Sequence, residues 1–399
     1  MTRPLLLDIT RLLSRVDRPH FTGVDRVEFQ YLQQFLNQEA PLFLIAKSRL
    51  GYKLFDRKGA VELHRRLSRN YPWGTSDWIS RLSKTNTPLK AQAEADTRRL
   101  AVHWGSIKSC LRKLETLSSG SWQYFNVAHS NLGRKTLRAM AGHKVTIFIH
   151  DTIPLDFPDL QPEGVSAAFR AKLTTVGRFA TEIICNSHAT KKDIQTHLSA
   201  HPANIRVAPL GIETSLAQYP AAAAPYAAPF FVTVGTIEPR KNHMLLLKIW
   251  QDLVKTHPAE DIPKLIIIGA RGWKNEDVFQ ILDTDPMMGR HVIEAGAVDD
   301  QALSVLLRGA QGLLFPSLAE GFGLPPAEAI SLGTAALCGD LPVYREFLGK
   351  KPVYLEVNNP YLWKETILEL ATIGKETAAI PVALSLPTWD AHFKIVNGQ

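Results

Sequence analysis

The chain has 399 residues, of which 45% are hydrophobic and 21% charged, a composition typical of a globular protein with room for two domains. No apolar run reaches about 18 residues, and the apolar run before Asp8 is too short for a signal peptide. We therefore expect no transmembrane helix and a cytoplasmic location. Cys110, Cys185 and Cys338 are far apart and odd in number, which indicates reduced thiols and neither a disulfide framework nor a zinc site.

The net charge of +8 is unevenly distributed. Residues 1–150 carry 25 Lys and Arg against 11 Asp and Glu, a balance of +14, whereas 151–399 carry 21 against 27, a balance of −6. A basic surface attracts anionic lipid, nucleic acid or phosphorylated substrates, but the sequence has no nucleic-acid recognition motif. Cations that alternate with tryptophans, as in 53–112, are typical of helices on an anionic membrane surface. The alternative is a solvated surface in which these tryptophans belong to the core. The tryptophans are Trp73, Trp78 and Trp104.

The first half alternates short apolar strands with helices, and each strand ends in a polar or small-residue turn. Apolar positions on one stripe predict a helix over 23–36, and the amides of Thr22 and Gly23 at its start could approach a ligand phosphate. Buried strands that alternate with helices indicate a parallel sheet covered on both faces. The predicted strands are 5–8, 41–46, 124–128, 144–149 and 182–185.

The alternation restarts after 217–229, a stretch with three prolines, seven alanines and no charge. Such a composition is typical of a linker. We expect a helix over 242–255 and a second parallel sheet, with ligands bound at the carboxyl ends of its strands. The predicted strands of this half are 229–234, 264–268, 291–295 and 312–315.

The first turn of the second half reads Gly235-Thr-Ile-Glu-Pro-Arg-Lys-Asn242 and enters a predicted helix. A helix start carries free amides and about half a positive charge, so it favours a phosphate. Arg240 and Lys241 add two full cations, of which the arginine can hold a phosphate bidentately. The alternative is a capped helix with surface cations. This turn is not a Walker loop, and no Gly-x-Gly-x-x-Gly follows a strand, which argues against a dehydrogenase.

Two carboxylates, Glu320 and Glu328, stand eight positions apart around a turn with two glycines and two prolines. The prolines fit the first positions of a helix, which places Glu328 in the first helical turn and Glu320 in the preceding loop. Glu328 then suits a ribose diol, and Glu320 suits the hydroxyls of a second sugar. Gly321 and Gly323 bring backbone amides close to that ligand. Otherwise, Glu328 stabilises the helix dipole and Glu320 is solvated.

Polar residues also follow the strands of the first half. His150 and His129 each follow a predicted strand, where a histidine can exchange a proton near neutral pH, although a structural role is more common there. Asn186 and Ser187 follow a third strand, where we expect an N-cap.

Together these motifs resemble the family 4 retaining glycosyltransferases, which have the two-Rossmann GT-B fold. The most specific string is Phe315-Pro-Ser-Leu-Ala-Glu-Gly-Phe-Gly-Leu-Pro-Pro-Ala-Glu-Ala329. The resemblance is strong over 229–347 and looser before, and residues from about 50 to 115 match nothing in it. Further similar strings lie at 22–26, 150–154, 186–187, 207–211, 234–242, 269–273 and 296–303.

The resemblance implies roles for particular residues. As catalytic residues, Arg240 and Lys241 would neutralise the donor diphosphate, Glu320 would hold the donor sugar, and His150 would lie near the reaction centre. Glu328 would bind the ribose. The other donor-binding residues that it implies are Gly23, Gly235, Gly272, Trp273, Gly321, Phe322, Gly323 and Leu324.

The fold that the resemblance implies is α/β, with two Rossmann-like domains whose parallel sheets face a central cleft. We expect an acceptor-binding domain over 1–216, a linker over 217–228 and a nucleotide-sugar-binding domain over 229–386. Residues 387–399 would form a helix that crosses back to the first domain.

The string Glu238-Pro-Arg-Lys-Asn242 resembles bacterial mannosyltransferases of O-antigen and exopolysaccharide pathways, although Thr236 stands where many relatives carry arginine. The implied reaction transfers mannose from GDP-mannose, with retention, to a glycan or lipid-linked oligosaccharide at the inner face of the cytoplasmic membrane. We expect no metal or other cofactor, since Asp283-Thr-Asp285 is predicted to lie between two outer elements. The alternatives are a UDP-sugar-dependent enzyme of the same fold, a sugar phosphorylase, and a non-catalytic nucleotide-sugar-binding assembly protein.

Overall fold

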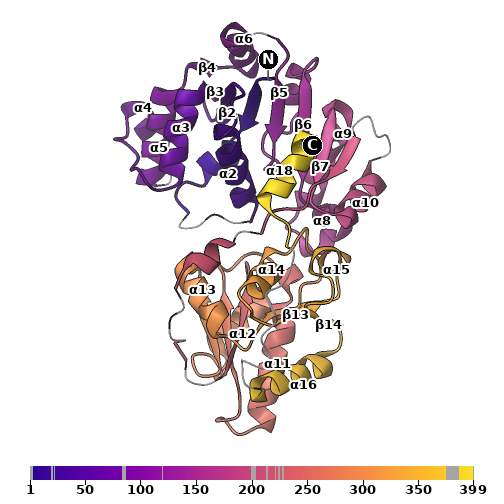
Figure 1. Cartoon of the computed structure of the whole chain (residues 1–399). Helices are drawn as coiled ribbons and strands as arrows, with labels where there is room; N and C mark the ends of the chain where they lie inside the picture. Colours follow the sequence, from indigo (N-terminus) through magenta and orange to yellow (C-terminus); the bar gives the residue numbers. More distant parts are fainter. Residues whose placement is uncertain are drawn as a thin grey trace. The chain divides into compact units, whose positions relative to one another are not determined.

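The computed structural model of the chain falls into two compact units (Figure 1). The first unit is Met1–His150, Ala168–Cys185 and Ile194–Val207, and the second is Asp151–Ala167, Asn186–Asp193 and Ala208–Gln399. Thr22, Lys84 and part of the predicted linker lie outside the described residues. The structure describes residues 3–18, 21, 23–82, 87–118, 120–198, 204–212, 214–220, 222, 225–226, 229–373 and 386–398.

An eight-stranded sheet forms the centre of the first unit, in the order β4-β3-β2-β1-β5-β6-β7-β8. The six neighbouring strands β2, β1, β5, β6, β7 and β8 pair in parallel, as predicted. Strands β3 and β4 extend the β2 edge of the sheet in antiparallel pairing. The central strand β1 is buried at every position, as expected for a parallel strand covered on both faces. The strands are β1 (Leu5–Asp8), β2 (Leu42–Ser48), β3 (Gly51–Phe55), β4 (His103–Gly105), β5 (Gln123–Asn126), β6 (Lys144–Ile149), β7 (Glu182–Cys185) and β8 (Asn204–Val207).

The predicted amphipathic helix over 23–36 is confirmed as α2 (Gly23–Leu36), and its apolar stripe packs on the first sheet. The Tyr31 and Phe35 rings lie 6.2 Å and 4.9 Å from the ring of Phe125 in β5. Ser187 accepts a hydrogen bond from the amide of Thr190 at 3.0 Å, which confirms the predicted N-cap. The other helices up to β8 are α1 (Thr10–Ser14), α3 (Arg57–Leu67), α4 (Trp78–Leu82), α5 (Pro88–Leu100), α6 (Ile107–Leu117), α7 (Arg134–Ala139), α8 (Ile153–Asp156), η1 (Pro158–Leu160), α9 (Val165–Phe179) and α10 (His188–His197).

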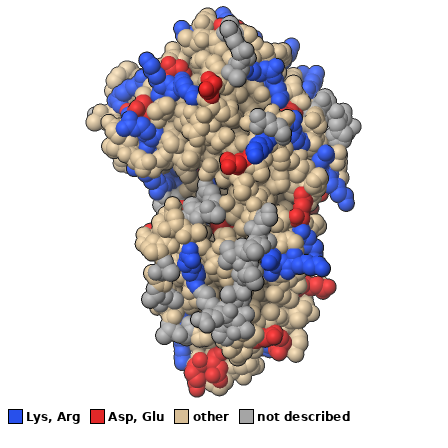
Figure 2. Space-filling model, in the orientation of Figure 1, with Lys and Arg blue, Asp and Glu red and all other residues tan. Residues whose placement is uncertain are grey.

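Residues 50–115, in which the sequence shows no motif of the resemblance, form β3, β4 and a layer of helices, α3 to α6, at that edge of the sheet (Figure 1). Helices α3, α5 and α6 begin at side-chain caps, and Asp56, Thr87 and Ser106 each accept a hydrogen bond from the amide three residues later. Lys and Arg side chains are frequent over the first unit on the face drawn in Figure 2.

The second unit has a six-stranded parallel sheet in the order β11-β10-β9-β12-β13-β14. Its core packs around the fully buried rings of Trp250 and Trp363. Its strands are β9 (Phe230–Val234), β10 (Lys264–Ile268), β11 (Val292–Gly296), β12 (Gly312–Phe315), β13 (Ala336–Gly339) and β14 (Val353–Leu355). Its helices after residue 208 are η2 (Thr214–Gln218), η3 (Pro239–Lys241), α11 (His243–Thr256), α12 (Glu276–Thr284), α13 (Asp300–Gly309), α14 (Leu324–Ser331), α15 (Pro342–Leu348), α16 (Pro360–Thr372) and α18 (Trp389–Asn397).

The terminal helix α18 packs on the segment 208–212. The amide of Ile212 donates to the Pro387 carbonyl at 2.9 Å, and a Cβ atom at Gly211 would overlap Trp389. Its predicted return to the first domain, like the domain boundaries at 216 and 229, stays a prediction. Cys110, Cys185 and Cys338 are free buried thiols, as predicted. Within the described ranges, no helix is long and apolar enough to cross a membrane.

Candidate active site

Two glycine turns lie side by side where β9 and β10 end. Gly235 and Gly269 have φ angles of 147° and 148°, which side chains rarely adopt, and a Cβ atom at Gly269 would overlap the Gly235 carbonyl. Gly272 donates its amide to the Ile237 carbonyl at 3.1 Å, and a Cβ atom there would come within 2.8 Å of Thr236. The glycines therefore let the two turns contact each other at the carboxyl edge of the sheet.

The chain does not pass directly from the β9 turn into a helix. The short helix η3 comes first, and Asn242 takes a left-handed conformation with φ of 55° before α11 begins at His243. This corrects the prediction that the helix begins at Asn242. The extra turn presents Arg240 and Lys241, and not the α11 amides, beside β12.

Arg240, Lys241 and Glu320 form a buried ion cluster. Lys241 Nζ lies 2.5 Å from Glu320 Oε1, and Arg240 Nη1 lies 2.8 Å from Glu320 Oε2. Arg240 also pairs with Glu238 through Nε at 2.5 Å and donates to the Ala319 carbonyl at 3.1 Å. The structure therefore brings together three of the four predicted catalytic residues, and the Glu320 side chain keeps only 7% of its exposure.

The Lys241 ammonium also lies over an aromatic ring, 4.2 Å from the centre of the Phe315 ring at the end of β12. Such a contact favours the charged form of the lysine. The side chain of Lys241 passes Gly235 closely, since a Cβ atom there would come within 3.1 Å of Lys241 Cε. The Gly235 turn thus leaves room for the lysine to reach Glu320.

Burial and pairing act in opposite directions on these pKa values. Burial would raise the pKa of Glu320, but the charges of Arg240 and Lys241 outweigh it and hold that pKa well below its ordinary value. Burial lowers the pKa of Lys241, and the Glu320 carboxylate partly offsets this. Arg240 and Glu320 are therefore charged at neutral pH, and Lys241 gives up its proton more easily than an exposed lysine.

Two further carboxylates lie near this cluster, and the sequence prediction missed both. Burial raises the pKa of Glu238, and Arg240 and Lys241 partly offset that rise. Burial also raises the pKa of Asp151 to about 6, partly offset by the charge of Arg240 and increased by Glu320. Asp151 directly follows His150 at the end of β6, a position that could have identified it as a candidate. The site is thus richer in carboxylates than the predicted pair.

The turn between Glu320 and α14 is fixed by packing. Gly323 has φ of 87°, and a Cβ atom there would overlap the Tyr344 ring. The Phe322 ring stacks on Phe347 with centroids 4.1 Å apart and is almost fully buried. Gly321 and Leu324, on either side of this pair, are half-buried. Close packing therefore explains Gly323, and whether amides of this turn bind a ligand stays a prediction.

Glu328 lies deeper in α14 than predicted. The helix begins at Leu324 with its prolines in the first turn, which holds no acidic residue. Glu328 is the fifth helical residue, so its placement in the first turn is wrong. It is buried, with 4% exposure. Because it lies beyond the first turn, interaction with the helix dipole is a poor explanation for its carboxylate.

Trp273 follows the β10 turn and is 37% exposed. Its indole Nε1 donates to the Leu160 carbonyl at 3.3 Å. The next residue, Lys274, donates from Nζ to the Asp159 carbonyl at 2.7 Å. In this structure these side chains bind the backbone of the η1 segment.

The predicted metal-like spacing of Asp283 and Asp285 has a structural explanation. Asp283 lies in the last turn of α12 and binds Arg271, with Oδ1 2.6 Å from Nη2. Asp285 ends that helix and accepts from Gln251 at 2.7 Å. The prediction that both lie between two elements is therefore wrong for Asp283.

His150 and Gly23 belong to the first unit and are described within it. His150 Nε2 lies 2.6 Å from the Val127 carbonyl, which can only accept, so this nitrogen carries a proton. The His150 amide donates to His129 Nε2 at 3.4 Å, and burial holds the pKa of His129 well below its ordinary value. Gly23 is exposed at the first residue of α2, where the buried Asp25 pairs with Arg11 at 2.5 Å. The arginine near the α2 start is thus already paired with a carboxylate, and a phosphate site there stays a prediction.

Comparisons with known proteins place this site in a family. Residues 220–380 match the model of glycosyl transferases group 1, and residues 98–216 match that of glycosyltransferase family 4. The serotype-specific mannosyltransferase WbdA of Escherichia coli is 27% identical over 237 residues, which are 55% of this chain and 29% of that protein. The O-antigen chain mannosyltransferase RfbU of Salmonella typhimurium is 24% identical over 59% of this chain and 65% of that protein. The match therefore spans less than two thirds of either relative.

The solved structure of Anabaena Alr3699/HepE in complex with UDP and glucose is similar throughout, with a TM-score of 0.60. The match covers 99% of this chain and 97% of that chain at 15% identity, a level that establishes the fold alone. The two parallel-sheet α/β units define a protein of the GT-B class, as predicted. With both family models matched, the chain belongs to glycosyltransferase family 4 and resembles O-antigen mannosyltransferases.

Proposed function

We propose that this protein is a retaining glycosyltransferase that moves mannose from GDP-mannose to a glycan or lipid-linked oligosaccharide in cell-surface polysaccharide synthesis. The observation that carries the proposal is the buried cluster of Arg240, Lys241 and Glu320 at the carboxyl edge of the second sheet. Two cations and a carboxylate in one dry site suit a ligand with both a diphosphate and sugar hydroxyls. The names of WbdA and RfbU, both mannosyltransferases, support the choice of sugar.

Donor binding would exchange the contacts within this cluster. Glu320 now pairs with both Lys241 and Arg240, so a diphosphate would take over the two cations while sugar hydroxyls donate to the freed carboxylate. Burial strengthens both sets of contacts, since water does not screen them. The freed Glu320 carboxylate would then be held by hydrogen bonds from sugar hydroxyls in place of its two cations.

The cations would then act on the leaving group. As the bond from the anomeric carbon to the phosphate oxygen breaks, negative charge grows on the diphosphate, and preorganised Arg240 and Lys241 stabilise it. The acceptor hydroxyl attacks the same face of the sugar and passes its proton to the departing phosphate oxygen. No metal ion or other cofactor enters this scheme. His150 would lie at the reaction centre and Glu328 at the ribose.

A donor screen tests this proposal. We expect the purified protein to release nucleoside diphosphate from GDP-mannose faster than from UDP-glucose or UDP-GlcNAc, with EDTA present. Lys241→Ala should lower release by about 100-fold or more, the size of a lost oxyanion donor, whereas exposed Lys255→Ala should match the wild type. Faster release from a UDP-sugar would support the alternative donor class. No release from any donor, with Lys241→Ala unchanged, would support a non-catalytic assembly protein.

The stereochemistry needs its own measurement. Proton NMR of the first-formed product should show the anomeric configuration of the donor sugar. Inversion would contradict the retaining scheme while leaving the donor assignment intact.

We also propose that the protein works in the cytoplasm at an anionic membrane surface through its first unit. Trp78 is 72% exposed and Trp104 is 41% exposed, so neither belongs to a core. Such rings suit a lipid interface. We expect sedimentation with anionic liposomes and not with neutral ones, and Trp78→Ser should weaken it. Equal pelleting with both kinds of vesicle would remove the electrostatic part of this proposal.

A further inference from the structure

An open cavity in the first unit is lined by α1, the β2–β3 hairpin and α5. Its volume is about 350 Å³, within the range of roughly 300–1,000 Å³ for small-molecule sites. Strand β3 and all but the last turn of α5 lie outside the two matched family models. Four cationic side chains line the cavity: Lys47, Arg49, Lys53 and Lys90.

Lys53 is the buried cation of this cavity. It lies in β3 with 3% exposure, and its Nζ donates to Thr97 Oγ1 at 2.6 Å and to the Glu94 carbonyl at 3.5 Å. Within the described part of the chain, no carboxylate forms an ion pair with Lys53. Burial lowers the pKa of Lys53 to about 8, and the charge of the nearby Glu94 carboxylate only partly offsets this. A buried ammonium held by neutral acceptors remains able to bind an anion.

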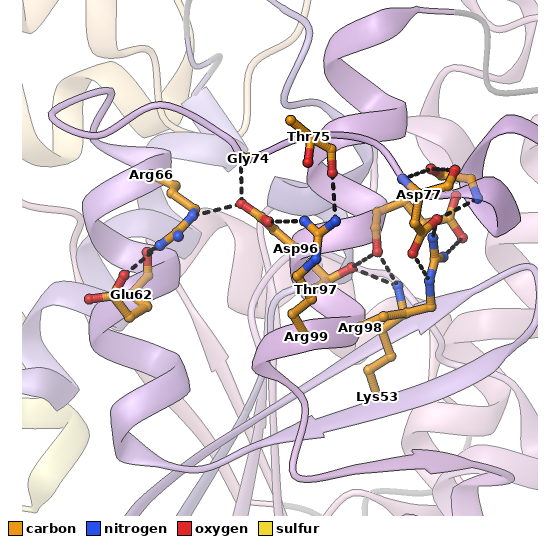
Figure 3. A network of polar contacts seen from close by, with 12 residues as sticks. Lys53, Glu62, Arg66, Gly74, Thr75, Asp77, Asp96, Thr97, Arg98 and Arg99 are labelled. Atoms are coloured by element: carbon orange, nitrogen blue, oxygen red, sulfur yellow. Dashed lines mark hydrogen bonds and ion pairs between the residues drawn. The ribbon is translucent and has the colours of Figure 1, made fainter.

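The neighbouring arginines are paired differently (Figure 3). Arg66 and Arg99 both bind Asp96, at 3.0 Å and 2.7 Å, and Arg98 binds Asp77. Asp96 also accepts from the Gly74 amide. These arginines connect α3, α5 and the loop before α4, so their charges stabilise the layer. Lys53 lies at the edge of the same network. Unlike these arginines, it forms no ion pair with a carboxylate among the described residues.

The carboxylates around the cavity are partly engaged by other cations. Glu94 is the acidic residue in its lining, and Arg98 already lies 3.3 Å from that carboxylate. Lys90 pairs with Asp17 at 3.1 Å and stays half-buried. The exposed Lys47 has no ion pair among the residues that the structure describes. Thr97 and the half-buried Thr10 add hydroxyl groups to the wall.

We propose that this cavity binds the phosphoryl group of a phosphorylated saccharide ligand. A phosphoryl group offers several oxygens to a cluster of ammonium and hydroxyl donors, and lysines bind it as mobile point charges. The cavity is several times larger than a phosphate, so the wall hydroxyls would hold the attached sugar. The assignment of that ligand as the acceptor rests on the proposed function, whereas the phosphoryl site rests on the cavity alone.

Two ligands share this chemistry, a soluble sugar phosphate and a saccharide on a prenyl diphosphate. Calorimetric titration without any nucleotide sugar separates them, using glucose 1-phosphate and geranyl diphosphate as probes. Tighter binding of geranyl diphosphate would assign the lipid-linked source, and tighter binding of glucose 1-phosphate would assign the soluble one.

Amino-acid substitutions test whether the probe binds in this cavity. Lys53→Met should lower affinity for the tighter probe by about tenfold or more, since a charge-assisted hydrogen bond is lost. Lys58→Met removes an exposed cation of the same layer and should leave affinity unchanged. Lys241→Met shows how much of the probe binds at the second-unit cluster, where the proposed donor site also accepts a diphosphate.

The melting temperature of Lys53→Met controls for folding, and we expect it to equal or exceed that of the wild type. If this variant does not fold, Lys47→Met, which replaces an exposed lysine of the cavity, should lower the affinity for the tighter probe instead. Wild-type affinity in the folded Lys53 variant, or a loss confined to Lys241→Met, would overturn the proposal. Because no donor is present, failure here is distinguishable from failure of the glycosyltransferase assignment.

Discussion

Replacing Glu320 by glutamine removes one buried charge while keeping the side-chain volume. Arg240 would keep Glu238 at 2.5 Å, but Lys241 has no second carboxylate partner within the described residues. Removing one partner of a buried ion pair lowers the free energy of unfolding by about 3–5 kcal/mol, because the other charge stays buried and unpaired. We therefore expect Glu320→Gln to destabilise the second unit by about this amount at pH 7. Replacing both partners should cost less than the two single changes together.

The assay must resolve the second unit from the first, since a chain of two units need not unfold in one step. Pulsed hydrogen exchange along a urea series, read on peptides from β12 and α14, gives the unfolding free energy of the second unit. Variants Glu320→Gln, Lys241→Met and the double variant form a cycle. Asp340→Asn, which breaks an exposed pair with Arg345 at 2.6 Å, is the control and should cost at most about 1 kcal/mol. A Glu320→Gln cost equal to the control, or additive losses in the double variant, would refute the reasoning.

Three further perturbations have defined outcomes. Asp151→Asn should stabilise the fold at pH 7 by about 1–3 kcal/mol, because burial raises the pKa of this half-buried carboxyl to about 6. The gain should fade as the pH falls from 6 towards 4, where the folded carboxyl binds its proton; a pH-independent gain in urea unfolding would contradict this. Gly323→Ala should cost at least about 2 kcal/mol through its φ of 87° and overlap with Tyr344; a smaller loss in urea unfolding would count against the packing argument. Asp96→Ala should cost about 1–3 kcal/mol, because Arg66 keeps Glu62 at 2.6 Å and Arg99 is half-exposed while the Gly74 amide loses its acceptor. It should also speed hydrogen exchange in α3 and α5, and unchanged exchange there would show that the network is not structural.

The local sequence pattern was enough to predict the buried parallel strands and the amphipathic helix. The predicted strands at 144–149, 182–185, 264–268 and 312–315 match the bounds of β6, β7, β10 and β12, and the helix over 23–36 matches α2. Buried parallel strands are continuous apolar runs, and an amphipathic helix has its own period, so both can be recognised without knowing the tertiary structure.

Elements that depend on distant partners could not be predicted in this way. Strand β3 contains Lys53, and β4 is three residues long with its middle residue, Trp104, exposed. Both pair at the sheet edge because residues far along the chain meet there, which no local period encodes. The antiparallel edge and its cavity were therefore missed.

The candidate site also has one part that the sequence could predict and one part that it could not. That Arg240, Lys241 and Glu320 share one site could be predicted, because their turns follow strands of one sheet. Their mutual ion pairs could not, since the η3 turn that presents the cations depends on the left-handed Asn242. The position of Glu328 was wrong by part of a helical turn, because α14 begins before its prolines.

Titration of GDP-mannose into the purified protein tests the central claim most directly. If Lys241, Arg240 and Glu320 hold the diphosphate and the sugar, GDP-mannose should bind, and Lys241→Met should weaken it by about tenfold or more through the lost charge-assisted contact. The exposed Lys255→Met should bind as the wild type does. Equal affinity of wild type and Lys241→Met for GDP-mannose would contradict the account.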